Sequence, residues 1–308
     1  MHRWVNVDHP TKEVAQGLHA TGRYYTHGRC PQDRRRADGE MTGAGLLADK
    51  IALITGGGAG IGRGIVTRFL AEGAKVVVAE YDEERCSTLR DDYAGNDSLH
   101  VVRTDVREKE QVPAPVRAAV DTFGGLDIPV NNAFTLSPRV LLEHKTDDML
   151  DGTLHAGLWA AWWGMQAARP IMAERGGGAI VNFYSIDVET AARLNSDYVV
   201  TKSALLGLTR SSAHEWGRFG IRVNSIAPTA MGTHFHALAA EHPGFAEASA
   251  ARKPLGRNGD PELDIAPVVV FLASEMSRFV TGELIHADGG LHMPGYDSRP
   301  ADLGSLGG

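Results

Sequence analysis

The sequence predicts an α/β protein: a single doubly wound, Rossmann-like parallel sheet of about seven strands with helices on both faces. From Lys50 onward, short apolar runs alternate with longer amphipathic segments, which is typical of repeated strand and helix units. The apolar runs are nearly continuous, as expected for parallel strands covered on both faces. A glycine-rich turn joins the first apolar run to the first amphipathic segment. We therefore expect one nucleotide-binding domain over residues 49–290.

Each expected strand is a short apolar run, and each expected helix is a stretch in which apolar residues recur at helical spacing. The strands are expected at Ile51 to Thr55, Lys75 to Glu80, Leu99 to Thr104, Leu126 to Asn131, Ala179 to Tyr184, Arg222 to Ala227 and Leu284 to Ala287. The helices are expected at Gly60 to Glu72, Glu83 to Tyr93, Val116 to Phe123, Asp147 to Glu174, Tyr198 to Phe219 and Pro261 to Ser274. Pro113 and Pro115 are expected to move the start of the third helix towards Pro115. Pro129 cannot donate a hydrogen bond within the fourth strand.

The two ends of the chain differ from this pattern. Residues 1–48 hold four of the thirteen histidines and show no strand or helix periodicity, so we expect a poorly ordered N-terminal extension. Met41 lies just ahead of the first strand and is a candidate for the native start. Intact mass of the protein from its native host tests this, because retention of Met1 would contradict it. Residues 291–308 are expected to form a C-terminal tail.

Composition excludes several classes of function. A hydrophobic content of 43% and a charged content of 22% describe an ordinary globular protein with ample core. The net charge of -7 gives no reason to expect nucleic acid or an anionic membrane surface as a partner. No apolar run reaches the roughly 18 residues of a membrane span, and no secretory signal is evident. Cys30 and Cys86 allow at most one disulfide, and reduced thiols in a cytoplasmic protein are expected.

The glycine-rich turn and the end of the second strand together predict a nucleotide site. Residues 55–62 read Thr-Gly-Gly-Gly-Ala-Gly-Ile-Gly, with a strand before and a helix after. Glycines permit close approach of the backbone to a pyrophosphate, and the helix N-terminus supplies N–H groups. Glu80 ends the second strand, where a carboxylate can accept hydrogen bonds from ribose hydroxyls and repel a 2′-phosphate. We therefore expect NAD in preference to NADP.

Three further residues predict acid–base chemistry on an alcohol or a carbonyl. Tyr198 and Lys202 lie one helical turn apart, so both side chains share a helix face. A lysine ammonium stabilises a phenolate and lowers the pKa of the phenol. Ser185, at a strand end thirteen residues upstream, can supply a hydroxyl that polarises the substrate oxygen. Such a site interconverts an alcohol and a ketone, and it needs a hydride carrier.

These residues resemble the short-chain dehydrogenase/reductase family over about Leu47 to Gly290. The resemblance rests on the order of the glycine turn, Asp105-Val106, Asn131-Asn132-Ala133, Ser185, Tyr198-x-x-x-Lys202, and Pro228 with Thr233. It implies catalysis by Ser185, Tyr198 and Lys202. It also implies cofactor contacts from Gly56, Gly60, Ile61, Gly62, Glu80, Asp105, Val106, Asn132, Ala133, Tyr198, Lys202, Pro228 and Thr233. Asp105 and Val106 would hold the adenine, and Pro228 and Thr233 the nicotinamide carboxamide.

The chain also departs from the family. Gly157 stands where the family has an asparagine that holds a water linking the lysine to solvent. Two outcomes are open: a second water fills the vacated space, or turnover is slow. Phe134 replaces a glycine after Asn-Asn-Ala, and Thr229 replaces the glycine after Pro228. A non-catalytic NAD-binding protein is therefore one alternative, and an NADP-linked ketoacyl-type reductase, which Glu80 argues against, is another.

The substrate and partners are constrained less closely. Phe134, Asp187 and Phe235 are expected to line the substrate pocket, which favours a partly apolar alcohol or ketone such as a cyclic or aromatic one. The polar segment from Ile186 to Asp197 is expected to be a loop at the entrance. His234 and His236 have no third ligand placed by spacing, so no metal is expected. By resemblance, a homodimer or homotetramer is expected, with Trp159 on a packing face of its helix.

Overall fold

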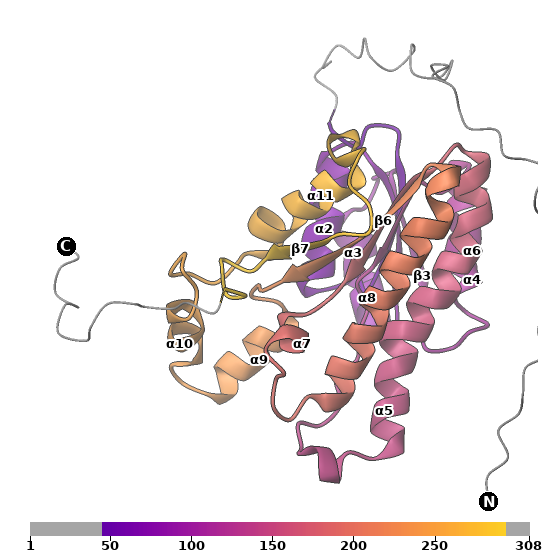
Figure 1. The fold of residues 1–308 in the computed structure, drawn as a ribbon. Helices are drawn as coiled ribbons and strands as arrows, with labels where there is room; N and C mark the ends of the chain where they lie inside the picture. The colour runs from indigo at the N-terminus through magenta and orange to yellow at the C-terminus, as the bar shows by residue number, and fades with distance from the viewer. Residues whose placement is uncertain (1–44, 294–308) are drawn as a thin grey trace, which may run out of the picture. The chain divides into compact units, whose positions relative to one another are not determined.

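The structure is a computed structural model that describes residues 45–293. Most of the extension expected at residues 1–48 and of the tail expected at 291–308 lies outside the described residues. Seven parallel strands form one sheet in the order β3-β2-β1-β4-β5-β6-β7. Helices cover both sides of this sheet, as Figure 1 shows. The prediction of a single doubly wound parallel sheet is therefore confirmed.

The expected strands and long helices are present with small shifts at their ends. The strands are β1 (Ile51–Thr55), β2 (Lys75–Glu80), β3 (Leu99–Arg103), β4 (Ile128–Asn131), β5 (Gly178–Phe183), β6 (Ile221–Pro228) and β7 (Leu284–Ala287). The covering helices are α2 (Gly60–Ala71), α3 (Glu83–Asp92), α4 (Pro113–Phe123), α5 (Asp147–Leu154), α6 (Ala160–Glu174), α8 (Ser196–Trp216) and α11 (Ala266–Ala273). No helix within residues 45–293 is both long enough and apolar enough to cross a membrane.

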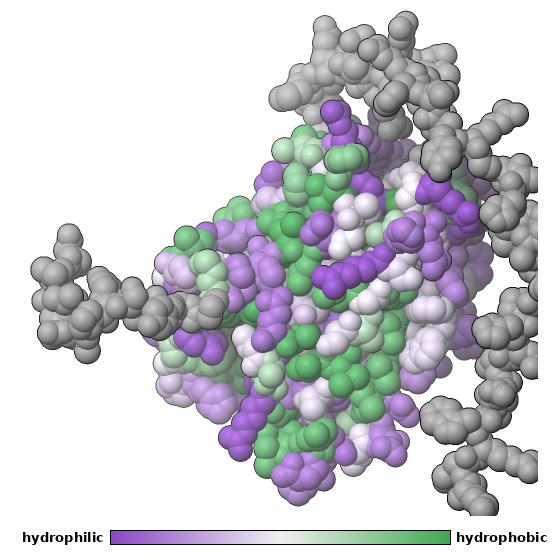
Figure 2. Space-filling view, viewed as in Figure 1, coloured by the Kyte–Doolittle hydropathy of each residue, from purple (hydrophilic) through white to green (hydrophobic). Residues whose placement is uncertain are grey.

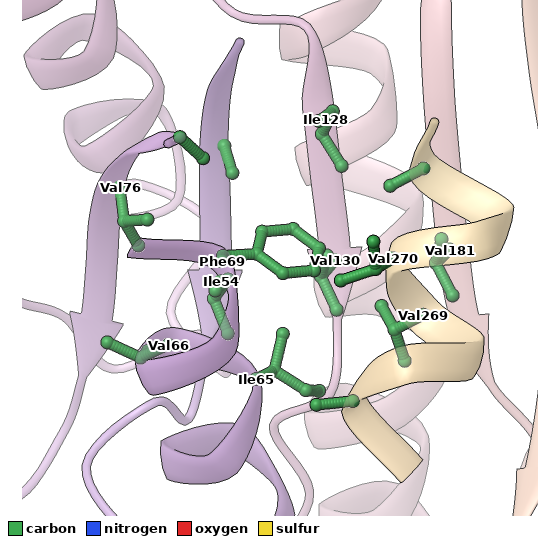
Figure 3. Packing of buried hydrophobic residues seen from close by; sticks show 14 of the residues in the cluster. Ile54, Ile65, Val66, Phe69, Val76, Ile128, Val130, Val181, Val269 and Val270 are labelled. Atoms are coloured by element: carbon green, nitrogen blue, oxygen red, sulfur yellow. The ribbon is translucent and has the colours of Figure 1, made fainter. Parts of the chain in front are cut away.

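Two apolar layers hold the helices against the sheet. On one face, α2 and α11 pack over the strands, and Figure 3 shows Phe69 of α2 between Ile54 of β1 and Val270 of α11. On the other face, α4, α6 and α8 bury a second set of apolar side chains, which includes Met165 and Leu205. Because both faces are covered, the central strands are mostly apolar, which is why the sequence shows nearly continuous apolar runs.

Three local features differ from the sequence-based expectations. Helix α4 begins at Pro113 rather than near Pro115, because a proline in the first helical turn lacks only an N–H that has no partner within the helix. The segment expected as a loop contains a short helix, α7 (Ile186–Glu189), which the Ser185 hydroxyl caps by accepting from the Asp187 N–H at 3.2 Å. The helix expected from Asp147 to Glu174 contains a π-helical turn, η2 (His155–Trp159).

Two further helices, α9 (Thr233–Glu241) and α10 (Phe245–Ala251), follow β6. Figure 1 places them beyond the carboxyl ends of β6 and β7, at the same end of the sheet as α7. Their sequences carry many alanines and no long apolar face, so periodicity gave no signal for them. They add cover to the end of the sheet at which ligands bind in doubly wound folds.

Candidate functional site

The glycine turn between β1 and α2 has a backbone that side chains would not permit. Gly56 and Gly60 have φ angles of +65° and +53°, in the left-handed region that favours glycine. A Cβ on Gly62 would lie 2.0 Å from the Gly56 carbonyl oxygen. Helix α2 begins at Gly60, and no side chain caps the N–H groups of its first turn. This turn therefore has the form of an anion-binding helix N-terminus.

Asn132 braces this turn from the neighbouring strand β4. Its Nδ2 donates to the Thr55 carbonyl oxygen at 2.9 Å and to the Gly56 carbonyl oxygen at 3.1 Å. The Thr55 hydroxyl oxygen in turn accepts from the N–H groups of Asn132 and Ala133 at 3.1 and 3.0 Å. The side chain of Asn132 thus fixes the shape of the turn, a role that spacing in the sequence did not indicate.

Glu80 is buried at the end of β2 and is bonded to the same turn. Its Oε2 accepts from the Gly58 N–H at 2.9 Å, while Oε1 accepts from the N–H groups of Tyr81 and Asp82 at 2.9 and 3.1 Å. A Cβ on Gly58 would lie 2.7 Å from Oε2 of Glu80 and 2.8 Å from Cβ of Arg85. Arg85 therefore places a basic residue beside the turn. Its position in the sequence did not predict this contact. Its Nε is 3.9 Å from Asp82 Oδ2.

Asp105 follows β3 and is engaged by a neighbour. Arg107 donates to both of its carboxylate oxygens, with Nε 2.9 Å from Oδ1 and Nη2 2.6 Å from Oδ2. This bidentate bond holds the pKa of Asp105 below its ordinary value. The Arg107 guanidinium also lies 5.2 Å from the centre of the Tyr81 ring. Arg107 thereby links the ends of β2 and β3, and Val106 lies between the paired residues.

The segment after β6 closes over the glycine turn. Pro228 ends β6, and Thr233 begins α9. A Cβ on Gly60 would lie 3.0 Å from both the N atom and the Oγ1 atom of Thr233. Two segments far apart in the sequence are thus in contact, and Thr233 lies beside the glycine turn.

The structure brings together Ser185, Tyr198 and Lys202. Ser185 lies two residues after the end of β5, and the other two lie on the first turns of α8. Nζ of Lys202, which is 3% exposed, donates to the Phe183 carbonyl oxygen at 2.6 Å. Burial and the nearby Asp187 carboxylate raise the pKa of Tyr198 to about 12, although the Ser185 hydroxyl beside it acts to lower the value. Burial lowers the pKa of Lys202 to about 7.

These pKa values differ from the expectation that Lys202 lowers the pKa of Tyr198. The ammonium is directed at Phe183 rather than at the phenol oxygen, and it lies 5.7 Å from the centre of the Tyr198 ring. Burial disfavours the charged form of both groups, so it moves the two pKa values in opposite directions. A phenol with this pKa is protonated at neutral pH, which suits it to donate a proton to a carbonyl oxygen.

Carbon atoms of two neighbouring side chains lie where a side chain on Gly157 would begin. A Cβ on Gly157 would lie 2.5 Å from Cγ2 of Thr201 and 2.8 Å from Cε2 of Phe134. The Phe134 ring contacts the Tyr198 ring edge to face, with centroids 4.9 Å apart. Nζ of Lys202 lies 4.6 Å from the centre of the Phe134 ring. Phe134 was expected to face the substrate, and the structure places its ring against the lysine.

The other expected substrate residues lie on α7 and α9. The Asp187 carboxylate accepts from Nδ2 of Asn195 at 3.0 Å. Phe235 packs against Phe245 of α10, with ring centroids 5.3 Å apart. Burial, chiefly, and the charge of Arg139 lower the pKa of His234, while Asp187 opposes this, so these three side chains share one environment. In residues 45–293 no group of three or more His, Cys, Asp or Glu side chains is placed to hold a metal ion.

A buried ion pair beside Tyr198 was not foreseen from the sequence. Lys145 and Asp197 have side chains 6% and 2% exposed, and Nζ lies 2.7 Å from Oδ1. The Ser137 hydroxyl also bonds to Asp197 and accepts from Lys145 at 2.7 Å. Although burial alone would raise it, these bonds hold the pKa of Asp197 below its ordinary value. The pair ties the segment after Phe134 to the residue next to Tyr198.

Known proteins of similar sequence are oxidoreductases. A family model described as enoyl-(acyl carrier protein) reductase matches residues 56–292. The chain is 36% identical over 250 residues to 3beta-hydroxysteroid dehydrogenase 2 of Eggerthella lenta, covering 80% of this chain and 95% of that protein. It is 35% identical over 250 residues to 2,3-dihydroxy-2,3-dihydro-p-cumate dehydrogenase of Pseudomonas putida, covering 80% of this chain and 96% of that protein.

Solved structures show the same fold. The crystal structure of levodione reductase matches with a TM-score of 0.76 and 31% identity, covering 81% of this chain and all of that one. The similarity therefore extends over the whole sheet and over the glycine turn, not over a single motif. Because relatives of this kind match four fifths of its length, the chain belongs to the short-chain dehydrogenase/reductase family, whose members are oxidoreductases that use a nicotinamide cofactor.

Proposed function

We propose that the protein is an NAD-dependent oxidoreductase that interconverts a secondary alcohol and a ketone, with Tyr198 as the acid and base. The observation that carries this proposal is the convergence of Ser185, Tyr198 and Lys202 at the end of β5, the end of the sheet where the glycine turn lies. The nicotinamide, when bound, supplies or accepts the hydride. The proposal requires a proton donor next to the substrate oxygen, and Tyr198 provides it.

The roles of the site residues follow from their surroundings. In the reducing direction the protonated Tyr198 phenol donates its proton to the ketone oxygen, and in the oxidising direction the phenolate accepts the hydroxyl proton. Ser185 donates a hydrogen bond to the same oxygen and stabilises the charge that develops there. Lys202, when protonated, places a buried positive charge beside the Tyr198 ring. A substrate oxygen bound between Ser185 and Tyr198 is held away from bulk water.

The glycine turn fits a dinucleotide. Positions 56, 58, 60 and 62 have no room for a Cβ or hold φ angles that favour glycine, and the first turn of α2 offers uncapped N–H groups. We propose that Gly56, Gly60, Ile61 and Gly62 contact the pyrophosphate, and Glu80 the adenosine ribose. Asp105 and Val106 would border the adenine, while Asn132, Ala133, Lys202, Pro228 and Thr233 would border the nicotinamide half.

We expect Glu80→Gln to weaken the preference for NAD over NADP. The Glu80 carboxylate is 5% exposed, so its repulsion of a 2′-phosphate is weakly screened. Glutamine keeps the shape and removes the charge, and its single oxygen can accept either from the Gly58 N–H or from the N–H groups of Tyr81 and Asp82. The ratio of kcat/KM with NADP to kcat/KM with NAD should rise by about 10- to 100-fold.

Asp82→Asn is the matched control for this change. Asp82 lies two residues away and is exposed, where it caps α3. Its loss of charge should leave the cofactor ratio nearly unchanged. A wild-type protein that turns over faster with NADPH than with NADH would contradict the proposal for Glu80.

The proposed substrates are partly apolar ring alcohols and the matching ketones. Phe235 and Phe245 supply apolar surface on α9 and α10, and the relatives named above act on a hydroxysteroid and on a dihydrodiol. A panel of cyclic and aromatic secondary alcohols should therefore give NADH formation at 340 nm, a wavelength at which only the reduced nicotinamide absorbs. Linear secondary alcohols of equal carbon number serve as the comparison.

A non-catalytic NAD-binding protein is the rival function, favoured by the carbon-filled space at Gly157. Measuring NADH affinity beside the turnover panel separates the two. Tight NADH binding with no turnover of any alcohol or ketone would support the rival. Turnover that Tyr198→Phe removes would support the enzyme.

We also propose that the protein acts in the cytoplasm as a homodimer or homotetramer. Trp159 and Trp162 on η2 and α6 are 39% and 41% exposed, and Val200 on α8 is 51% exposed. Figure 2 shows hydrophobic surface over the lower part of α8 and beside α5. Light scattering tests this, and a strictly monomeric mass would count against it.

A further inference from the structure

The ammonium of Lys202 is buried and has few hydrogen-bond acceptors among the described residues. Within residues 45–293, the hydrogen bond that the structure gives its Nζ goes to the Phe183 carbonyl oxygen at 2.6 Å. A buried lysine ammonium normally needs several acceptors, because burial strongly disfavours its charge. Among the described residues, two aromatic rings also lie beside this Nζ.

The Phe134 ring faces Nζ, with its centre 4.6 Å away. The face of an aromatic ring carries negative potential and attracts a cation within about 6 Å, more strongly where water is excluded. The Tyr198 ring lies farther from Nζ, at 5.7 Å, and stands nearly perpendicular to the Phe134 ring. Phe134 is therefore the nearer of the two aromatic partners of the charge.

The surroundings of Phe134 fix its ring in this place. Gly157 lacks a side chain where the ring packs, since a Cβ there would lie 2.8 Å from Cε2 of Phe134. On the N-terminal side, the Ala133 N–H donates to the Thr55 hydroxyl oxygen at 3.0 Å. On the C-terminal side, Ser137 is bonded to the buried pair of Lys145 and Asp197. The segment is thus held at both ends, which an unused surface residue would not need.

We propose that Phe134 is a positioning residue for Lys202: its ring face stabilises the charged form of the buried amine and holds it in place, and Gly157 makes room for the ring. The consequence for turnover rests on the proposed function, whereas the effect on the lysine does not.

The titration of Lys202 tests the inference without catalysis. The chain has seven lysines, so protein labelled with ¹³C at lysine Cε gives few signals, and the Lys202 signal is identified by its loss in Lys202→Met. Trifluoro- and pentafluorophenylalanine at position 134 keep the shape of the ring while weakening its negative face. The titration midpoint of Lys202 should fall from the wild-type protein to the trifluoro variant and again to the pentafluoro variant, by about one pH unit in all.

Phe134→Leu is the second variant, and it removes the ring face altogether. It should lower the midpoint at least as far as the fluorinated rings do. Thr201→Val is the matched control, because Thr201 also packs against Gly157 but its side chain bonds to Asp197 and Thr153 rather than to the ammonium. It should leave the midpoint of Lys202 in place.

Two results separate this inference from the proposed function. An unchanged midpoint across the fluorinated series and Phe134→Leu would overturn the role of Phe134, whatever the protein catalyses. A shifted midpoint in a protein that turns over no alcohol would leave this inference standing and contradict the proposed function. Where turnover is present, the alkaline limb of kcat/KM should move to lower pH together with the midpoint.

Discussion

Tyr198→Phe is expected to lower kcat by about 10²- to 10⁴-fold, the usual contribution of a positioned acid or base. The substitution removes one oxygen and leaves the ring, so the edge contact with Phe134 and the packing of α8 remain. NADH affinity should stay close to that of the wild-type protein, because the substitution leaves the glycine turn and the other proposed cofactor contacts unchanged. Steady-state kinetics with a ring alcohol and a separate NADH titration measure the two effects.

Tyr184→Phe is the matched control for this prediction. Tyr184 immediately precedes Ser185 and is also buried, and burial raises the pKa of its phenol as well. The substitution Tyr184→Phe makes the same chemical change next to Ser185, but it removes no proposed proton donor. We expect kcat to remain within a few-fold of the wild-type value. Full turnover in Tyr198→Phe would refute the assignment of Tyr198.

Lys202→Met is expected to abolish most activity and yet stabilise the fold at pH 7. In the unfolded chain the lysine has a pKa of 10.5, whereas burial lowers it to about 7 in the fold. Between these values the unfolded state binds more protons, so the stability of the wild-type protein rises with pH. The buried lysine therefore costs about 4 kcal/mol at pH 7. The Phe183 carbonyl loses its donor in the variant, so the net gain should be about 1–3 kcal/mol.

The pH dependence of this gain is its test. Urea unfolding should give a higher free energy for Lys202→Met than for wild type at pH 7. Near pH 10.5 the cost of burying the charge has almost vanished while the bond to Phe183 is still lost, so the variant should there be less stable than wild type. Lys253→Met is the control. Lys253 is also buried, but its Nζ bonds to Ser249 twice and to Asn258, so its loss should destabilise the fold. An equal effect of Lys202→Met at both pH values would contradict the explanation.

The sheet and the glycine turn could be predicted from the sequence, because each strand and the turn itself are formed by consecutive residues. Apolar runs with helices between them admit few arrangements, and the turn at residues 55–62 needs its glycines for local reasons. Ser185, Tyr198 and Lys202 were also found, since a strand end and one helical turn place them. The expected start of the helix at Pro115 was wrong, because a proline in a first turn costs little.

Contacts across the fold could not be foreseen in the same way. Phe134, Gly157 and Thr201 come from three separate segments, and only their packing shows that a glycine in one makes room for a ring from another. The Lys145 and Asp197 pair and the contact of Arg85 with the glycine turn have the same origin. Side chains that contact each other from distant parts of the chain produce no periodic pattern in the sequence, so such contacts cannot be predicted from periodicity.

The brace that Asn132 forms on the glycine turn has a consequence for the speed of exchange. Hydrogen bonds from Asn132 to Thr55 and Gly56 give the turn its shape without help from any bound molecule. The entropy of ordering these residues is therefore lost once, during folding, and not again at each binding event. A nicotinamide cofactor bound at this turn would then find its shape already held by the protein's own hydrogen bonds. Such a preformed turn suits a coenzyme that shuttles between enzymes rather than one that remains bound.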